Sequence, residues 1–304
     1  MTVNVSKDEK LMTATLVKQE RSRPDWLKIK LDTSSDFIRT QKLMREQNLN
    51  TVCEEARCPN IYECWGRSTA TIMILGNTCT RSCGFCSVKT GKPQMVDSEE
   101  PIRTAAAVKS MQLNHVVITS VDRDDLKDDY GAQIWAKTIE AIRQYTPECT
   151  IEVLTPDFQN YRSSFEKIFQ AKPDIFSHNI ECVQRISCQV RPQSDWNRSL
   201  SILKASVEYG LITKTGMMVG LGETDDEVLE AMQEAADLGI TIFNIGQYLQ
   251  PTMNHLTVKR FVHPDIFKMY REKGLKLGFR VVESGPLVRS SYHADEQVSR
   301  LPIS

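Results

Sequence analysis

Six of the nine cysteines in this 304-residue chain lie between positions 53 and 86. Three of them, Cys79, Cys83 and Cys86, form a C-x-x-x-C-x-x-C motif. Three thiolates this close together can hold three corners of a [4Fe–4S] cluster and leave one iron open to a substrate. A structural zinc site, the alternative, needs four protein ligands that usually come in C-x-x-C pairs. The spacing therefore predicts a cluster with one open coordination position.

A second cysteine triplet lies just upstream of the first. Cys53, Cys58 and Cys64 form a C-x4-C-x5-C motif. Three more soft ligands at loop spacing indicate a second iron–sulfur cluster, and the alternative is three unrelated thiols. The remaining cysteines are interpreted as structural or incidental thiols: Cys149, Cys182 and Cys188.

The composition limits the class of protein. The chain is 40% hydrophobic and 25% charged with a net charge of −1, which is typical of a globular protein without a field favouring nucleic acid or membranes. It contains no apolar run of about 18 residues and begins without an apolar signal core. Cysteines are too sparse for a disulfide scaffold. We therefore expect an enzyme of the cytoplasm, with neither nucleic acid nor membrane as a partner.

Short β-branched runs alternate with segments of helical periodicity from residue 70 onward. The expected strands are Ala70–Leu75, His115–Ser120, Thr150–Thr155, Asp174–Asn179, Ile212–Val219 and Thr241–Tyr248. The expected helices include Ala132–Tyr145, Tyr161–Ala171, Asp195–Tyr209 and Asp225–Leu238. This alternation predicts a parallel sheet covered by helices. Because six units are fewer than the eight of a closed barrel, we predict an α/β fold with a partial (β/α)6 TIM-type barrel; a flat, doubly wound sheet is the alternative.

The expected helix Asp225–Leu238 has the clearest boundaries. Thr224 suits the N-cap and Glu227 the N3 position, which together form a capping box. Gly239 suits the position just after the helix.

Polar segments follow each of the six expected strands. They are the loop that contains Cys79–Cys86, then Thr119–Asp125, Thr155–Asp157, His178–Glu181, Gly220–Thr224 and Gln247–Thr252. In parallel α/β folds the active site lies at the carboxyl ends of the strands. We therefore expect these segments to meet at one mouth, as in an enzyme.

The first triplet, with Phe85 before its last cysteine, resembles the radical S-adenosylmethionine superfamily. The resemblance implies that the open iron binds S-adenosylmethionine, whose cleavage gives a 5′-deoxyadenosyl radical. Gly216–Glu223 resembles the superfamily's G-x-I-x-G-x-x-E element, whereas Thr119–Asp122 stands in place of its usual Gly-Gly-Glu. The S-adenosylmethionine contacts expected from this resemblance are Phe85, Thr119, Ser120, Asn179, Glu181, Arg191, Met218 and Gly220. Ordinary loop polarity or surface ion pairing is the alternative for the three side chains Asn179, Glu181 and Arg191.

A more specific resemblance covers about residues 24 to 298. The C-x4-C-x5-C spacing, the surrounding EEARCPNIYECW and the late Arg289-Ser290-Ser291-Tyr292 are similar to the lipoyl synthase family. The resemblance implies a sulfurtransferase that inserts two sulfur atoms at C6 and C8 of a protein-bound octanoyl-lysine. It implies a sacrificial auxiliary [4Fe–4S] cluster as the sulfur source, held by the upstream triplet and by Ser290. A serine oxygen is a harder and weaker iron ligand than a thiolate, which suits a cluster that must come apart.

The expected domains follow from these motifs. They are a basic arm (1–50), an auxiliary-cluster segment (51–69), a radical S-adenosylmethionine partial barrel (70–275) and a C-terminal extension with the R-S-S-Y element (276–304). Residues 18–45 hold eight Lys/Arg against four Asp/Glu, so the arm is either a solvated segment or a docking surface for an acidic partner.

The partners implied by the family are octanoylated lipoyl carrier domains and a reducing protein such as ferredoxin or flavodoxin. The carrier would be a 2-oxoacid dehydrogenase E2 or a glycine cleavage H protein. The arm residues considered for carrier docking are Arg21, Arg23, Lys28 and Lys30. Two alternative functions remain: another sulfur-inserting radical enzyme of the biotin synthase type, and a non-catalytic iron–sulfur carrier or scaffold.

Overall fold

An eight-stranded sheet forms the centre of the computed structural model, which describes residues 23–29, 34–66, 71–298 and 300–301. In spatial order its strands are β1 (Asn50–Thr51), β2 (Thr71–Ile74), β5 (His115–Ser120), β6 (Thr150–Leu154), β7 (Ile175–Ser177), β8 (Ile212–Val219), β9 (Ile242–Gln247) and β10 (Val281–Gly285). β1 pairs with β2 antiparallel, and the other neighbours are all parallel. The order ends at β1 and at β10, so strand pairing does not close the barrel within the described residues.

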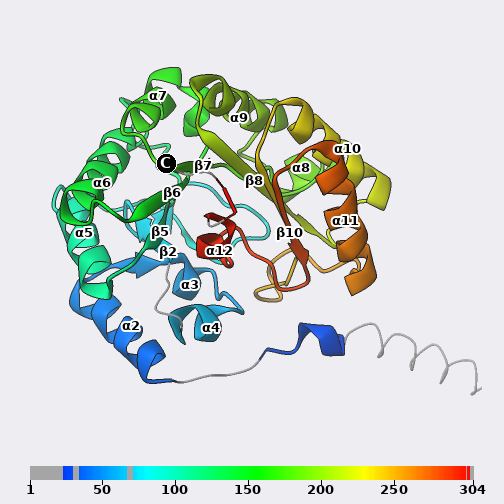
Figure 1. Ribbon diagram of the computed structural model, residues 1–304, viewed down its shortest axis with the longest axis horizontal. Coiled ribbons are helices and arrows are strands. Elements are labelled where there is room, and N and C mark those ends of the chain that lie inside the picture. Colours follow the sequence, from blue (N-terminus) through cyan, green and yellow to red (C-terminus); the bar gives the residue numbers. More distant parts are fainter. Residues whose placement is uncertain (1–22, 30–33, 67–70, 299, 302–304) are drawn as a thin grey trace, which may run out of the picture.

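Helices cover the outside of this curved sheet. The outer helices are α5 (Glu100–Met111), α6 (Ala132–Tyr145), α7 (Arg162–Gln170), α8 (Gln184–Val190), α9 (Trp196–Tyr209), α10 (Asp225–Asp237) and α11 (Pro264–Leu277). Apart from α8, they form a ring around the strands; α8 and α12 (Ala294–Val298) lie inside that ring in this view (Figure 1). The smaller elements are η1 (Asp25–Leu27), α2 (Ser35–Glu46), α3 (Val52–Glu55), α4 (Ile61–Gly66), η2 (Phe158–Asn160), β3 (Thr78–Cys79) and β4 (Lys89–Thr90).

The predicted α/β partial barrel is confirmed. All six predicted strands are present, with ends that differ from the prediction by no more than two residues; Ala70 lies outside the described residues. The four predicted helices are present as well, and α6 has the predicted bounds. In α10 the Thr224–Glu227 capping box is formed, and Gly239 has a φ of +82°. The short strands β1 and β10 are additions that the sequence pattern did not reveal.

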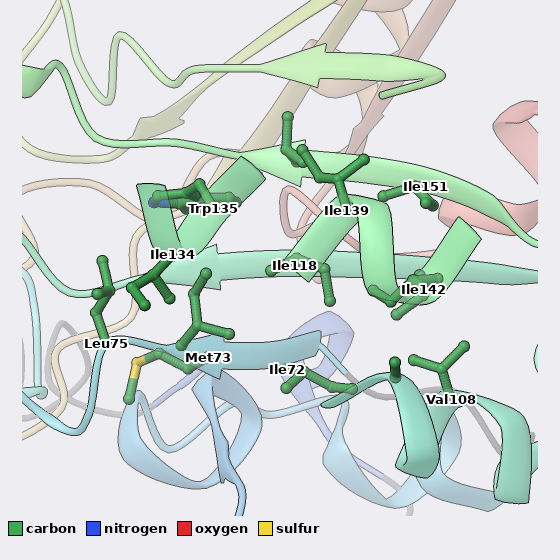
Figure 2. Close-up of a cluster of buried hydrophobic side chains, with 14 of the residues drawn as sticks. Ile72, Met73, Leu75, Val108, Ile118, Ile134, Trp135, Ile139, Ile142 and Ile151 are labelled. Atoms are coloured by element: carbon green, nitrogen blue, oxygen red, sulfur yellow. The ribbon is translucent and has the colours of Figure 1, made fainter. Parts of the chain in front are cut away.

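The main core lies between the sheet and helices α5 and α6. Outward-facing residues of three neighbouring strands, Ile72, Ile118 and Ile151, are each 0% exposed. Figure 2 shows them clustered with Trp135, Ile139 and other side chains of the covering helices. Burial of this apolar surface contributes about 25 cal/mol per Å2 to folding and fixes the strands that position the cysteine loops.

Part of the barrel interior holds buried charged groups, unlike the layers of branched apolar residues that fill a closed barrel. The ammonium of Lys214 on β8 lies 2.9 Å from Oε1 of Glu152 on β6, and both side chains are almost completely buried. Burial, together with the neighbouring Lys214 charge, lowers the pKa of His115 on β5 to about 4. This histidine is therefore neutral near pH 7 and leaves Lys214 and Glu152 to neutralise each other.

Breaking the Lys214–Glu152 pair on one side should be costly. We expect Lys214→Met to lower the free energy of unfolding by about 3–5 kcal/mol, because it leaves a buried carboxylate without a counter-charge. The double variant Lys214→Met/Glu152→Leu should recover most of that loss, since it leaves no buried charge. Denaturant unfolding of the three proteins measures both effects. Equal stability of the single and double variants would contradict this role for the pair.

Candidate active site

One cavity of about 520 Å3 passes through the interior of the barrel. Its wall contains all six cysteines of the two triplets and Ser290. It also contains the following residues expected to contact S-adenosylmethionine: Phe85, Thr119, Ser120, Asn179, Glu181, Arg191 and Met218. The structure thus brings into one space groups that span more than 230 residues of sequence.

Gly220, the remaining expected contact, does not line this cavity. Its φ is +101°, and a Cβ there would collide with Nε2 of Gln247 and with the carbonyl oxygen of Arg260. Glycine is therefore required at this position by the backbone conformation and by close packing behind the cavity wall.

The two triplets lie at opposite ends of strand β2. The first follows the carboxyl end of β2, and the backbone N–H of Thr80 donates to the carbonyl of Asp122, just beyond β5. The second begins in α3, directly after β1, which runs antiparallel to β2 with Thr51 opposite Ile72. Because the chain enters α3 beside the amino end of β2, the cavity separates the two sets of thiols.

Neighbouring loops hold the first triplet in place. The N–H of Gly84 donates to the carbonyl of Val190 at 2.8 Å, and the N–H of Leu256 donates to the carbonyl of Gly84 at 3.0 Å. A ring nitrogen of His255 donates to the carbonyl of Cys86 at 2.9 Å. A Cβ on Gly84 would lie 2.9 Å from Cγ of Leu256, so only glycine allows this approach. The cysteine loop is therefore fixed by segments that follow β7 and β9.

Arg81, between the first two cysteines of this triplet, was not identified from the sequence. Its guanidinium is buried and makes ion pairs with Asp122 at 3.2 Å, Asp124 at 2.7 Å and Asp157 at 2.6 Å. Arg198 supplies a second positive charge to Asp157 at 3.2 Å. Three loops that end different strands thus meet on one side chain, which anchors the cysteine loop to the mouth of the barrel.

The donor set fits iron–sulfur clusters. All six thiols are free rather than disulfide-bonded. Burial, with the nearby carboxylate of Asp122, raises the pKa of Cys79 to about 11, and burial raises the pKa of Cys53 to about 12. These two thiols are therefore protonated near pH 7, and a cluster would bind them with release of protons. Soft sulfur donors in threes suit iron–sulfur clusters better than a hard cation.

The C-terminal segment covers the second triplet. The amide of Asn60 donates to the carbonyl of Leu287 at 2.7 Å, and the hydroxyl of Thr71 donates to that of Ser291 at 2.7 Å. The hydroxyl of Tyr292 contacts both carboxylate oxygens of Glu63 at 3.1 Å. The C-terminal segment therefore lies against residues that separate the cysteines of this triplet and against Thr71, which follows them.

Ser290 is held by two asparagines, one just beyond the end of β7 and one within β9; these two strands lie on either side of β8. Nδ2 of Asn179 donates to Oγ of Ser290 at 2.7 Å, and Nδ2 of Asn244 donates to its carbonyl oxygen at 3.0 Å. On β9, Gly246 allows this approach, because a Cβ there would collide with the carbonyl oxygen of Val288. Asn244 and Gly246 are site residues that no sequence motif indicated.

The expected S-adenosylmethionine contacts lie along the side of the cavity between β5 and β8. Thr119 donates to the carbonyl of Leu154 at 2.9 Å. Arg191, which is buried, donates to the carbonyl of Asn179 at 3.2 Å. Burial raises the pKa of Glu181, while the guanidinium of Arg191 lowers it. This side of the cavity thus combines a carboxylate, a guanidinium and an amide, which are groups that can bind hydroxyl, carboxylate and amino groups.

Comparison with known proteins identifies the family. Residues 73–235 match the model of the radical SAM superfamily, and residues 3–58 match the model of the N-terminal domain of lipoyl synthase. The chain is 53% identical over 285 residues to the lipoyl synthase of Rubrobacter xylanophilus, covering 92% of this chain and 88% of the relative. The chain belongs to the lipoyl synthase family. It is therefore a radical S-adenosylmethionine enzyme of the sulfur-inserting class, as the resemblance of its cysteine motifs implied.

Other members of the lipoyl synthase family show similar agreement. The lipoyl synthase of Shouchella clausii is 50% identical over 301 residues, covering 98% of this chain and 95% of the relative. That of Flavobacterium johnsoniae is 50% identical over 278 residues, covering 91% of this chain and 96% of the relative.

Solved structures share the fold. Streptococcus suis SuiB bound to S-adenosylmethionine superposes with a TM-score of 0.58 at 11% identity, covering 92% of this chain and 62% of SuiB. Methylornithine synthase (PylB) superposes with a TM-score of 0.53 at 11% identity, covering 81% of this chain and 82% of that protein.

Of the helices that the structure describes, none has the length and apolar character needed to cross a membrane.

His178 lies in the cavity wall, and two hydrogen bonds fix its ring. Its Nδ1 contacts the carbonyl of Thr155 at 2.8 Å, so that nitrogen must carry the proton, and its Nε2 accepts from the hydroxyl of Ser199 at 3.0 Å. Burial, reinforced by the charge of Arg191, lowers the pKa of His178 to about 4 even though Asp157 opposes the shift. This ring is therefore a neutral spacer next to Asn179.

The low pKa of His178 predicts a pH dependence of stability. Between its unfolded pKa of about 6.5 and its folded pKa of about 4, the unfolded chain binds the proton and the folded chain does not. Stability is thus lost as pH falls through this range, by about 3 kcal/mol in total. His178→Gln keeps one donor and one acceptor but does not titrate, so its unfolding free energy should fall less steeply with acidification.

The control for this measurement is His263→Gln, because His263 is exposed and does not line the cavity. Denaturant unfolding at several pH values should give the control the wild-type slope. If the unfolding free energy of His178→Gln and of the wild type changed equally with pH, the low pKa assigned to His178 would be contradicted.

Proposed function

We propose that this chain inserts two sulfur atoms at C6 and C8 of a protein-bound octanoyl-lysine, using two [4Fe–4S] clusters and S-adenosylmethionine. The observation that carries the proposal is the placement of the two cysteine triplets at opposite ends of β2, with one cavity between them. A substrate within this cavity would lie between a source of radicals and a source of sulfur. This arrangement fits insertion into an unactivated C–H bond, which acid–base chemistry cannot attack.

The first triplet would hold the cluster that binds S-adenosylmethionine. Cys79, Cys83 and Cys86 supply three thiolates, so one iron stays open for the amino acid part of the cofactor. When bound, this cluster supplies the electron that cleaves S-adenosylmethionine to a 5′-deoxyadenosyl radical. Arg81 keeps the loop against three aspartates, so the chain itself fixes where the radical forms.

The side of the cavity between β5 and β8 would hold S-adenosylmethionine. Phe85 lies in the cavity wall beside the last cysteine and offers an aromatic face for the adenine. The charged groups available to the ribose and the amino acid part are Glu181 and Arg191. The other proposed contacts are Thr119, Ser120, Asn179 and Met218, while Gly220 supports this wall from behind.

The second triplet and Ser290 would hold the auxiliary cluster. Cys53, Cys58 and Cys64 come from α3, α4 and the turn between them, and Ser290 is brought to the same cavity by the C-terminal segment. The chemistry expected of this cluster is the donation of sulfide to the substrate. A serine oxygen leaves iron more readily than a thiolate does, so the chain provides one weak corner.

The middle of the cavity suits an alkyl chain. Met73 on β2, Val117 on β5 and Leu154 on β6 line it between the two triplets. These inward-facing residues exclude water from the space in which a carbon radical would exist. A hydrocarbon chain can therefore be held by apolar contact alone, with its reactive carbons placed by the length of the cavity.

The proposed macromolecular partners are an octanoylated carrier domain and a reducing protein such as ferredoxin or flavodoxin. The carrier would be a 2-oxoacid dehydrogenase E2 or a glycine cleavage H protein. Arg23 and Ile29, which flank η1, line the outer part of the cavity, so the arm is close enough to contact a carrier that delivers its lysine. Arg21 and Lys30 lie outside the described residues.

Separate loss of each triplet tests the division of labour. Cys79→Ala should abolish formation of 5′-deoxyadenosine with dithionite as reductant. Cys58→Ala should keep that activity yet give no mass gain on an octanoyl-lysyl peptide, because the sulfur source is lost. After anaerobic reconstitution each variant should hold roughly four irons, against roughly eight in the wild type. Sulfur insertion by Cys58→Ala would contradict the proposal.

Charge reversal in the arm tests carrier docking. Arg23→Glu/Lys28→Glu should weaken binding of an acidic octanoylated carrier domain by about tenfold or more at low salt, because close charge pairs across an interface couple by more than 1 kcal/mol. Reductive cleavage of S-adenosylmethionine without carrier should not change. The matched control is Lys204→Glu/Lys268→Glu, which reverses two exposed charges on the outer helices α9 and α11. Equal carrier affinity of the two double variants would contradict docking at the arm.

A further inference from the structure

Asn179 has two different environments on the two sides of its amide group. Its Nδ2 donates to Oγ of Ser290 at 2.7 Å. Its Oδ1 is buried and has no hydrogen-bond partner among the described residues. A buried carbonyl oxygen without a partner loses free energy on desolvation unless a ligand donates to it. One side of this amide therefore holds the C-terminal serine, and the other side carries an acceptor that no group in the described part of the chain uses.

Asn179 lines the side of the cavity proposed for S-adenosylmethionine. Oδ1 of Asn179 has almost no exposed surface and lies 3.3 Å from the position that a Cβ of Gly216 would occupy, so the absence of a side chain at Gly216 leaves space beside it. The backbone of Asn179 is fixed by Arg191, whose Nη1 donates to its carbonyl at 3.2 Å. Glu181, two residues further on, lines the same cavity. A hydroxyl or amino group of the nucleoside could donate to Oδ1 in this place.

Asn244 provides an internal comparison. Its Nδ2 also points to Ser290, but it donates to the backbone carbonyl at 3.0 Å rather than to the side-chain oxygen. Its Oδ1 is likewise buried and unpaired in the described part of the chain. Both asparagines thus hold the same residue, and only Asn179 contacts the oxygen proposed to bind iron.

We propose that Asn179 is a positioning residue that couples S-adenosylmethionine binding to retention of Ser290 at the auxiliary cluster. The inference rests on the proposed function, since it needs both clusters. A ligand that donates to Oδ1 fixes the plane of the amide, and the same plane aims Nδ2 at Ser290. A hydrogen bond to the serine oxygen stabilises its negatively charged, iron-binding form. The weak corner of the cluster would then stay closed while the cofactor is bound and open more readily after the nucleoside leaves.

The test is the rate of iron loss to a chelator, measured on the two-cluster protein without reductant, so that no turnover occurs. Comparison with Ser290→Ala identifies the phase that belongs to the serine corner. In the wild type, saturating S-adenosylmethionine should slow this phase about fivefold or more, as expected for an ordinary coupling between two sites. In Asn179→Ala the phase should be faster, and S-adenosylmethionine should no longer slow it, even at concentrations shown by equilibrium dialysis to saturate the variant.

Two further variants keep the test specific. Asn244→Ala should also release iron faster but should retain the slowing by S-adenosylmethionine, because it does not touch the serine side chain. Asn179→Asp has the same shape and keeps an acceptor oxygen but loses the donor, so it should bind S-adenosylmethionine and still lose the slowing. Thermal unfolding checks that each variant is folded, and Asn179→Asp provides the answer if Asn179→Ala does not fold.

The inference would be overturned if S-adenosylmethionine slowed iron loss as much in both Asn179 variants as in the wild type, or if it did not slow iron loss in the wild type. Either result counts against the inference alone when the protein holds roughly eight irons. A wild-type protein with only roughly four irons and no phase dependent on Ser290 would instead contradict the proposed function, and the inference with it. The iron count therefore separates the two failures.

Discussion

The short strand β2 is the constraint on which the rest of the site depends. It has four residues, so its ends are separated by roughly 10 Å. One cysteine triplet follows its carboxyl end, and the other is brought to its amino end by the antiparallel pairing of β1. The packing of α5 and α6 against Ile72 and its neighbours fixes this strand in the wall of the barrel (Figure 2). The separation of the two chemical functions is thus a property of the core.

Two groups of buried charges, one at the mouth of the barrel and one in its interior, accompany the separation of the two cysteine triplets. The cysteine loop must stay at the carboxyl edge while the cavity remains open, and Arg81 achieves this by binding aspartates from two further loops. Deeper in the barrel, Lys214 and Glu152 occupy space that branched apolar residues fill in a closed barrel. Such pairs are weak contributors to net stability, but the loss of one partner is costly. They keep a partial barrel ordered around a cavity.

Local signals made much of the fold and part of the site predictable. The cysteine spacings, the strand–helix alternation and the Thr224–Glu227 capping box are all patterns within a few residues, and the family and the partial barrel are confirmed. Long-range contacts were not predictable: Arg81 gives no local sign of its aspartates, and β10 is recognisable only beside β9. Gly220 differs from both groups. Its glycine pattern predicted a contact with the ligand, whereas in the structure Gly220 is packed behind the cavity wall. The assignment of cluster and cofactor contacts to single residues stays a prediction.

The central claim is that the second triplet holds the sulfur that enters the substrate from the far end of the cavity. It is tested most directly by loading the protein with clusters built from heavy-isotope sulfide, removing all free sulfide, and analysing the octanoyl-lysyl product of a single turnover by mass spectrometry. The account predicts that both inserted sulfur atoms carry the heavy isotope and that no more than one product forms per chain. A product containing unlabelled sulfur, or continued turnover without added sulfide, would contradict it.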